Sequence, residues 1–316
     1  MKNSRILIVG GAGYIGGYLT DLLIDNHYNI TVYDNLMYET RFLKKVNFIN
    51  GDIRDYNKLK DILPNYDVVI WLAAIVGDGA CTIDQHLTQQ INTETVKWLI
   101  QNFKGKIIFT STCSVYGMNS DLLDETSTPN PLSMYASTKL EAEQYIINNY
   151  EDYLIFRLGT LFGIGDNFSR IRLDLVTNVL TYKATIGEML TVFGGEQWRP
   201  LLHVKDVSTA ILHGLKNDIK GLYNLSYNNF TIRDIAVTIE TIIPNTKISY
   251  TELPFEDMRN YKVNHNKFTL TGWNPSFTIK DGIHEMYNII KSGRIVNADD
   301  PIYHNHYYLK SIWKNK

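Results

Sequence analysis

The chain has 316 residues, 44% of them hydrophobic and 20% charged, which is typical of an ordinary globular protein with a sizeable core. Its 31 basic and 33 acidic side chains leave a net charge of -2, so charge gives no reason to expect a nucleic-acid or membrane-surface partner. The longest apolar run, residues 68–76, is far too short to span a bilayer.

Two cysteines, Cys81 and Cys113, are too few for a disulfide framework, and their spacing fits no zinc motif, so no metal site is predicted. The first residues, MKNSRILIVGG, lead directly into a strand-like run and lack the apolar segment of a signal peptide. We therefore expect a protein of the reducing cytoplasm.

The first half of the chain alternates short apolar segments with helical patterns. In chain order the strand-like segments are RILIVG, NITVYD, VNFING, DVVIWLAA, KIIFTST and YLIFRL. Helical patterns begin near residue 14 and cover residues 84–103 and 135–150. Apolar strands separated by helices predict a doubly wound parallel sheet of the Rossmann type, buried on both faces.

After residue 163 the pattern loosens into a helix-like run, a glycine-rich turn and helices around short strands. Residues 203–226 again contain strand, helix and strand patterns. We assign residues 1–163 to the sheet domain, to which 203–226 return, and residues 164–202 and 227–316 to a smaller, interleaved α/β region that binds substrate.

The segment VGGAGYIGG joins the first strand to the first helix and has G-x-G-x-x-G spacing. Gly10, Gly13 and Gly16 allow a tight turn, so that a dinucleotide pyrophosphate can approach the helix N-terminus. Asp34 ends the second strand about 20 residues on, where a carboxylate accepts hydrogen bonds from the adenosine ribose. No Arg or Lys occurs in residues 35–39 to bind a 2′-phosphate, so NAD is favoured over NADP.

A second acid, Asp52 in NGDIRD, ends the third strand and is well placed to meet the adenine amino group. Taken alone, either acid has a plainer interpretation as a turn or cap residue. The combination with the glycine loop favours the dinucleotide site.

The segment SMYASTKL places Tyr135 and Lys139 four residues apart, on one face of a helical pattern. Tyrosine is a poor base at neutral pH, but a nearby ammonium and a nicotinamide cation favour the phenolate. Such pairs are also common on protein surfaces. This pair, however, follows the strand KIIFTST at the carboxyl edge, where ligands bind in such sheets, and this favours a catalytic role.

Together these motifs resemble the extended short-chain dehydrogenases/reductases, specifically NAD-dependent nucleotide-sugar epimerases and dehydratases of the UDP-glucose 4-epimerase-like group. The matching motifs follow one another along essentially the whole chain: GGAGYIG, YDN, GDIRD, WLAA, STCSVYG, YASTK and WRPLLHVKDV. The resemblance implies that Tyr135 is the catalytic acid or base. It implies that Lys139 and the Thr112 hydroxyl stand beside it, around the sugar hydroxyl that is oxidised.

The resemblance also implies which residues contact the cofactor, NAD. They are Gly10, Gly13, Tyr14, Ile15, Gly16, Asp34, Asn35, Asp52, Ile53, Leu72, Ala73, Ala74, Asn92, Tyr135 and Lys139. For Asn92, a polar contact between two helices is nearly as good an interpretation.

On the substrate side, Arg199 in QWRPLLHV matches the arginine that binds the substrate diphosphate, for which its planar fork is suited. Arg259 in DMRNYKV is a second candidate, with a surface ion pair as its rival. His203 is interpreted as a structural residue. The resemblance further implies a homodimer formed through residues 85–103 and 135–150.

Two departures from the family pattern bear on the reaction. Thr160 stands where epimerases and dehydratases present an asparagine to the sugar. Cys113 and Ser114 follow Thr112 where 4,6-dehydratases carry Asp-Glu. Eliminating water across C5 and C6 needs an acid and a base, so 4,6-dehydration is disfavoured.

The leading hypothesis is NAD-dependent oxidation at C4 of a nucleoside-diphosphate sugar in polysaccharide biosynthesis, with Tyr135 as base. The enzyme is then a 4-epimerase or a 4-dehydrogenase. The alternatives are a nucleotide-4-keto-sugar reductase and a non-catalytic dinucleotide-binding module, although such modules tend to lose the Tyr or Lys. A cysteine enzyme using Cys113 is the poorest option.

Overall fold

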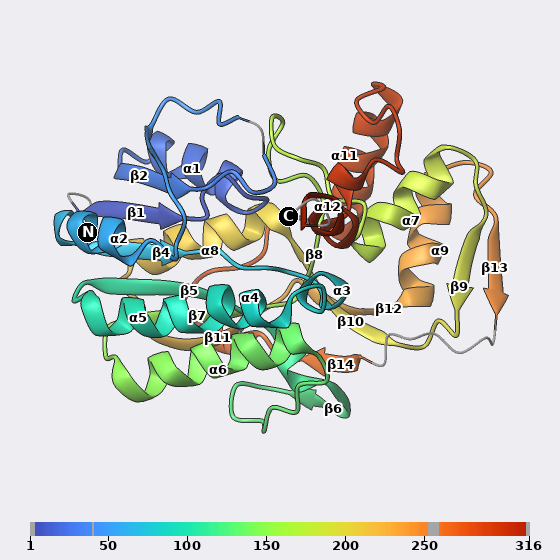
Figure 1. The fold of residues 1–316 in the computed structure, drawn as a ribbon. Helices are drawn as coiled ribbons and strands as arrows, with labels where there is room; N and C mark the ends of the chain where they lie inside the picture. The colour runs from blue at the N-terminus through green and yellow to red at the C-terminus, as the bar shows by residue number, and fades with distance from the viewer. Residues whose placement is uncertain (1–3, 40, 252–258, 314–316) are drawn as a thin grey trace.

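The computed structural model describes residues 4–39, 41–251 and 259–313 (Figure 1). Its centre is a seven-stranded parallel sheet with the order β11-β7-β5-β4-β1-β2-β3. The strands are β1 (Arg5–Val9), β2 (Asn29–Asp34), β3 (Asn47–Asn50), β4 (Val68–Trp71), β5 (Lys106–Thr112), β7 (Tyr153–Leu158) and β11 (Gly221–Leu225). The doubly wound Rossmann-type sheet predicted from the sequence is confirmed, and its strand order reverses between β1 and β4.

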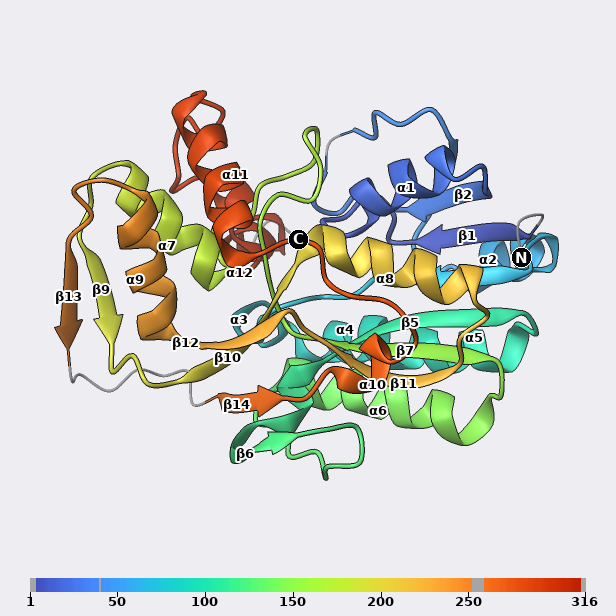
Figure 2. The same ribbon diagram turned by 180° about the vertical axis from the view of Figure 1, so that it is seen from behind.

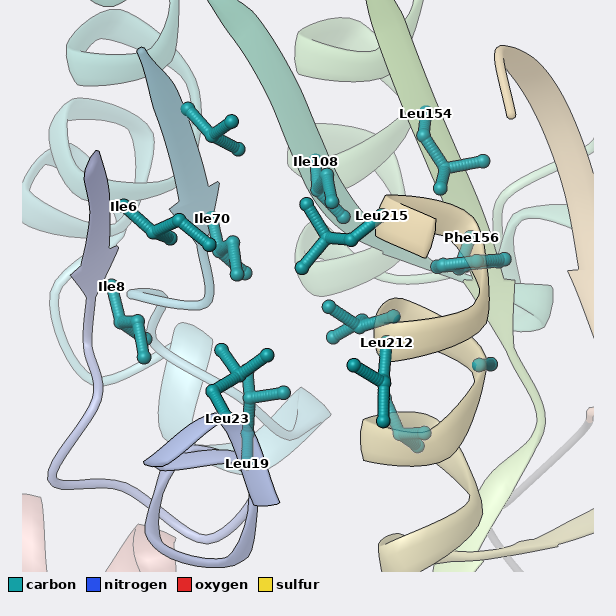
Figure 3. Close-up of a cluster of buried hydrophobic side chains, with 14 of the residues drawn as sticks. Ile6, Ile8, Leu19, Leu23, Ile70, Ile108, Leu154, Phe156, Leu212 and Leu215 are labelled. Carbon is teal, nitrogen blue, oxygen red and sulfur yellow. The ribbon is translucent and has the colours of Figure 1, made fainter. Parts of the chain in front are cut away.

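Helices cover both faces of this sheet. On one face lie α1 (Gly16–Asp25) and α8 (Val204–Lys216), and on the other lie α2 (Tyr56–Ile62), α5 (Thr95–Asn102) and α6 (Met134–Asn149) (Figures 1 and 2). Successive residues of β1 point to opposite faces, so Ile6 packs in the first core and Leu7 in the second. Figure 3 shows the first core, where Leu19 of α1 and Leu215 of α8 meet strand side chains.

The helical pattern over residues 84–103 forms with one irregularity. It consists of α4 (Gln85–Gln89), a π-helical turn η2 (Gln90–Glu94) and α5. The wider turn carries Asn92, whose side chain is buried. Single π-turns of this kind occur frequently at functional sites.

The remaining strands form three small sheets at the carboxyl end of the main sheet (Figure 1). β8 (Thr160–Phe162), β10 (Trp198–His203) and β12 (Asn228–Thr231) make one sheet. β9 (Leu190–Phe193) pairs with β13 (Ile248–Thr251), and β6 (Met118–Leu123) pairs with β14 (Asn260–Val263). Helices α7 (Val176–Thr185), α9 (Ile232–Ile242) and α11 (Ile279–Lys291) share a core with β9 and β10.

Short elements complete the chain. They are η1 (Leu63–Asn65), α3 (Asp78–Cys81), η3 (Cys113–Tyr116), α10 (Asn266–Thr269), η4 (Pro301–Tyr303) and α12 (Asn305–Trp313). Within the described ranges, no helix is long and apolar enough to cross a bilayer.

The two regions are interleaved in space. Residues 203–226 supply α8, which packs beside α1, and β11, which forms an edge of the main sheet. Conversely, β6 of the first half pairs with β14 of the second. The chain leaves the main sheet after β7, and β8 already belongs to a small sheet, so the expected boundary at residue 163 falls directly behind β8.

Candidate active site

A cavity of about 850 Å³ lies at the carboxyl edge of the main sheet, where the small sheets and the C-terminal segment meet it. Most of the predicted site residues line it: Gly10, Gly13, Tyr14, Ile15, Asp34, Asn35, Asp52, Ile53, Leu72, Ala73, Ala74, Thr112, Tyr135, Lys139, Arg199 and Arg259. The predicted cofactor and substrate residues therefore share one cavity, of a size typical for small-molecule sites.

The glycine loop fits a dinucleotide because its backbone is packed too closely for side chains. A Cβ on Gly10, where φ is +81°, would lie 2.5 Å from Ala73 N. A Cβ on Gly16 would lie 2.4 Å from the carbonyl oxygen of Gly11. The loop can therefore turn tightly onto the start of α1 and leave backbone N–H groups for a diphosphate. Gly16 itself supports this turn and is not part of the cavity wall.

The two predicted adenosine-side acids are held by different partners. Asp34 Oδ2 accepts a hydrogen bond from Ala12 N (3.0 Å) and Oδ1 accepts one from Leu36 N (2.8 Å). Burial raises the pKa of Asp34, and these backbone hydrogen bonds oppose the rise. Asp52 accepts from Arg54 Nε (2.9 Å) and Nη2 (2.7 Å), and these hydrogen bonds lower its pKa. Both carboxylates border the cavity at the ends of β2 and β3.

Tyr135 and Thr112 meet at the centre of the site. Tyr135 lies in the first turn of α6, which Ser133 caps by accepting a hydrogen bond from Ala136 N (3.2 Å). The Thr112 side chain lies close enough to the Tyr135 hydroxyl to lower its pKa. Thr112 Oγ1 also accepts from Ser114 N (3.1 Å), which fixes its orientation at the end of β5.

Burial opposes charge on both members of the Tyr-Lys pair. It raises the pKa of Tyr135 well above the usual range, while the Thr112 side chain and the positive charge of Arg172 act against the rise. It lowers the pKa of Lys139 from 10.5 to about 7. The Lys139 ammonium lies 3.9 Å from the centre of the Phe109 ring. In the protein alone, burial thus favours a neutral phenol, so ionising Tyr135 depends on positive charge brought near it.

The two residues after Thr112 offer no carboxylate to the cavity. Cys113 is fully buried, its Sγ donates to the carbonyl oxygen of Arg157 (3.1 Å), and burial raises its pKa well above the usual range. Ser114 lines the cavity, with its Oγ 3.3 Å from the Tyr261 hydroxyl. Cys113 therefore lacks the exposed thiolate that a nucleophile needs.

Asn92 does not reach the cavity wall. Its Oδ1 accepts from Ile75 N (2.8 Å), and its Nδ2 donates to Ile75 O (3.0 Å) and Thr138 Oγ1 (3.2 Å). It thus holds the segment after β4, which does line the cavity, against α6. Asn92 thus makes a polar contact with α6, as its second interpretation has it. It can affect a bound cofactor only indirectly, through the segment around Ile75.

The two arginines proposed for the substrate lie next to each other. Arg199 on β10 is 4% exposed and donates to the backbone oxygens of Trp198 (2.9 Å) and Arg259. Arg259 forms an ion pair with Asp78 (3.4 Å) at the start of α3. Arg259 thus both lines the cavity and forms an ion pair, as its two interpretations require. His203 is fully buried and bonded to Glu285 (2.9 Å), which fits a structural role.

Several charged residues of the cavity wall were not identified from the sequence. They are Glu39, Asp78, Arg170, Arg172, Asp174 and Lys183, and residues 304–307 of the C-terminal segment line the cavity beside them. The available signal was the run RIRLD, in which charges alternate with the buried Ile171 and Leu173. When charged and apolar residues alternate in a buried segment, the charged side chains lie on one side of the backbone. Buried charges of this kind are rare unless they are paired or bind a ligand.

The fold and this cavity define a dinucleotide-dependent α/β enzyme with a Tyr-Lys pair beside the cofactor loop. Residues 6–227 match the NAD dependent epimerase/dehydratase family, and the chain belongs to that family. The predicted family resemblance, enzymatic character and NAD cofactor are thereby confirmed.

Relatives of known type catalyse different reactions. The chain is 28% identical over 305 residues to a putative UDP-glucose 4-epimerase of Methanocaldococcus jannaschii, covering 91% of this chain and 98% of the relative. It is 27% identical over 302 residues to UDP-glucuronic acid decarboxylase 5 of Arabidopsis thaliana, covering 89% and 88%. Among solved structures it is similar to UDP-glucuronic acid 4-epimerase from Bacillus cereus in complex with UDP-glucuronic acid and NAD (27% identity, TM-score 0.78, covering 91% and 99%).

Proposed function

We propose that this protein oxidises C4 of a nucleoside-diphosphate sugar by hydride transfer to NAD, as a 4-epimerase or a 4-dehydrogenase. The observation that carries the proposal is that Tyr135 and Thr112 line the same cavity as the two arginines proposed for the substrate diphosphate. A single nucleotide sugar can then place its diphosphate on the arginines and a sugar hydroxyl on Tyr135.

The residues of the chain supply binding and proton transfer. Tyr135 takes the proton of the C4 hydroxyl, and Thr112 holds the same hydroxyl in line. Lys139 contributes positive charge that favours the phenolate when it is protonated. Bound NAD supplies the hydride acceptor. Because Tyr135 and Lys139 are buried, electrostatic interactions between them and a bound ligand are stronger than they would be in water.

The reaction ends in one of two ways. In an epimerase the keto sugar turns in the cavity and recovers the hydride on its other face, whereas in a dehydrogenase it leaves as product. Asp34, which disfavours a 2′-phosphate, argues against the NADPH-dependent reductase. The buried Cys113 and the hydroxyl of Ser114 argue against 4,6-dehydration, because neither supplies an acid or base of suitable strength.

The test is incubation of the purified protein with UDP-, GDP- and dTDP-sugars, following product mass and reduced-cofactor absorbance together. Unchanged mass with a changed C4 configuration indicates epimerisation, and loss of two hydrogen atoms indicates oxidation. Loss of water, or no reaction with any sugar in the presence of NAD, contradicts the proposal.

Assembly and location are part of the same proposal. We infer a homodimer formed through the helices of residues 85–103 and 135–150, acting in the cytoplasm. These helices cover one face of the main sheet (Figure 1). Because the cavity lies at the carboxyl edge of that sheet, such a dimer leaves it free.

A further inference from the structure

We infer that Arg172 is a further diphosphate-binding residue of the cavity, additional to Arg199 and Arg259. The inference rests on the proposed function for the identity of the ligands, since both NAD and a nucleotide sugar carry a diphosphate. It concerns residues 164–175, none of which was predicted as a site residue from the sequence.

Arg172 presents a fixed guanidinium to the cavity. Its Nε and Nη2 donate to the two oxygens of Asp174 (2.9 and 3.1 Å), in the bidentate arrangement that locks an arginine fork. The residue is 7% exposed and lines the cavity. Among the described residues, its Nη1 has no hydrogen-bond partner. One donor edge of a buried cation is therefore left for a bound ligand.

Other residues fix Asp174 in turn. Its Oδ2 also accepts from Asn305 N (3.0 Å), at the start of α12. The Asn305 side chain donates to Val76 O (2.9 Å) and accepts from Arg170 Nη2 (2.5 Å). Asn305 thus ties three segments together: the C-terminal segment, residues 164–175 and the loop after β4. Such support is what a preorganised binding residue requires, because an untethered arginine loses side-chain entropy on binding.

The surroundings of Arg172 indicate where the diphosphate lies. Its guanidinium carbon is 5.6 Å from the ring centre of Tyr14, which belongs to the glycine loop. The Tyr14 hydroxyl donates to Gly163 O (2.5 Å), so the loop and the segment with Arg172 are joined. Diphosphates bind at the N-terminus that this loop leads into. This position favours the dinucleotide's diphosphate over that of the sugar nucleotide.

The test compares Arg172→Met with Arg294→Met by isothermal titration calorimetry, with NAD in one arm and UDP in the other. Arg294 is the matched control because its Nη2 donates to Ser169 O (2.6 Å) in the same segment, while it lies outside the cavity wall. Loss of a hydrogen bond to a charged group predicts about ten- to hundredfold weaker NAD binding in Arg172→Met. Arg294→Met should bind NAD as the wild type does.

The outcomes separate the possibilities. Weaker binding of NAD supports the inference, and weaker binding of UDP alone supports it with the substrate diphosphate as ligand. Unchanged affinity for both overturns it, whatever the change in thermal stability. If Arg172→Met does not fold, Arg172→Lys, which keeps the charge and loses the fork, is expected to bind severalfold more weakly and decides the matter. A wild-type protein that binds neither ligand contradicts the proposed function itself.

Discussion

At the scale of single residues, the site is built from titratable groups whose charged forms are disfavoured by burial. Tyr135 and Lys139 lie on the same face of α6, and burial disfavours both the phenolate and the ammonium. Arg172 and the Thr112 hydroxyl act in the other direction on Tyr135. The site is therefore poised for ligands to change its protonation state, which is common where acid–base chemistry is carried out.

Replacing Tyr135 by Phe should abolish turnover and leave cofactor binding intact. The variant keeps the ring and loses the proton acceptor, so kcat should fall by about 10²- to 10⁴-fold. Steady-state assays paired with NAD titration measure both properties. Tyr145→Phe is the control, because Tyr145 is a partly buried residue of the same helix that contacts Gln101 and does not line the cavity. A normal kcat in Tyr135→Phe would show that Tyr135 is not the catalytic acid or base.

Replacing Lys139 by Met should change how stability depends on pH in the cofactor-free protein. The pKa of Lys139 falls from 10.5 to about 7 on folding, so between these values the unfolded chain binds the extra proton. The free energy of unfolding of the wild type should therefore rise with pH from about 7 to 10.5, and this contribution should vanish in the variant. Urea unfolding across that range measures it, with exposed Lys60→Met as control. Equal slopes for wild type and Lys139→Met would show that Lys139 is not desolvated.

At the scale of elements, the π-turn η2 links the helical layer to the cavity. The Asn92 side chain hydrogen-bonds to both backbone groups of Ile75: its Oδ1 accepts from the N–H, and its Nδ2 donates to the carbonyl oxygen. Without Asn92, the buried Ile75 N–H would lack a partner, and its carbonyl oxygen would keep only the Cys81 thiol (3.4 Å). One side chain therefore sets the shape of one wall of the cofactor site.

Asn92→Ala should destabilise the fold by about 1 to 3 kcal/mol, because it leaves the Ile75 N–H buried without a partner and its carbonyl oxygen with only the Cys81 thiol. NAD affinity should fall as well, since residues 72–76 line the cavity. Urea unfolding and NAD titration measure the two effects. Asn102→Ala removes a comparable amide, bonded to Trp98 O (2.8 Å) at the exposed end of α5, and should change neither. Wild-type stability in Asn92→Ala would show that these groups find other partners.

The same elements show which features a sequence reveals. The glycine loop and Asp34 could be predicted because a tight turn and a strand end are local, and each needs particular residue types. Asn92 could be noticed but not placed, since its partner Ile75 is 17 residues away. Arg172 was not predicted because its orientation depends on Asp174 and, through it, on Asn305. Asn305 lies 133 positions further along the chain and reaches the cavity only after folding.

At the scale of the whole molecule, the chain crosses between its two regions several times, so the cavity is closed by parts distant in sequence. The edge strand β11 comes from the second half, and the C-terminal helix α12 packs against α3 of the first. The helices α5 and α6 lie side by side on one face of the main sheet (Figure 2). That layer is the surface that we propose for self-association.

Light scattering should give twice the mass of the chain if α5 and α6 form the dimer interface. Ile147 on α6 is 36% exposed, and Ile147→Glu would place a charge in that interface and shift the mass toward the monomer. Ile186→Glu is the control, because Ile186 is 46% exposed beside α7, in the second region. A monomeric wild type, or equal dissociation of both variants, would contradict this interface.

In the proposed reaction, hydride passes from C4 of a nucleotide sugar to NAD while Tyr135 removes the proton of the C4 hydroxyl. The most direct measurement uses nucleotide sugars deuterated at C4, with mass spectrometry of both product and cofactor after reaction. We expect the deuterium at C4 of the product or on the reduced cofactor, and we expect Tyr135→Phe to prevent the transfer. Deuterium released to water, or retained at C4 of a product that has lost water without ever reaching the cofactor, would contradict it.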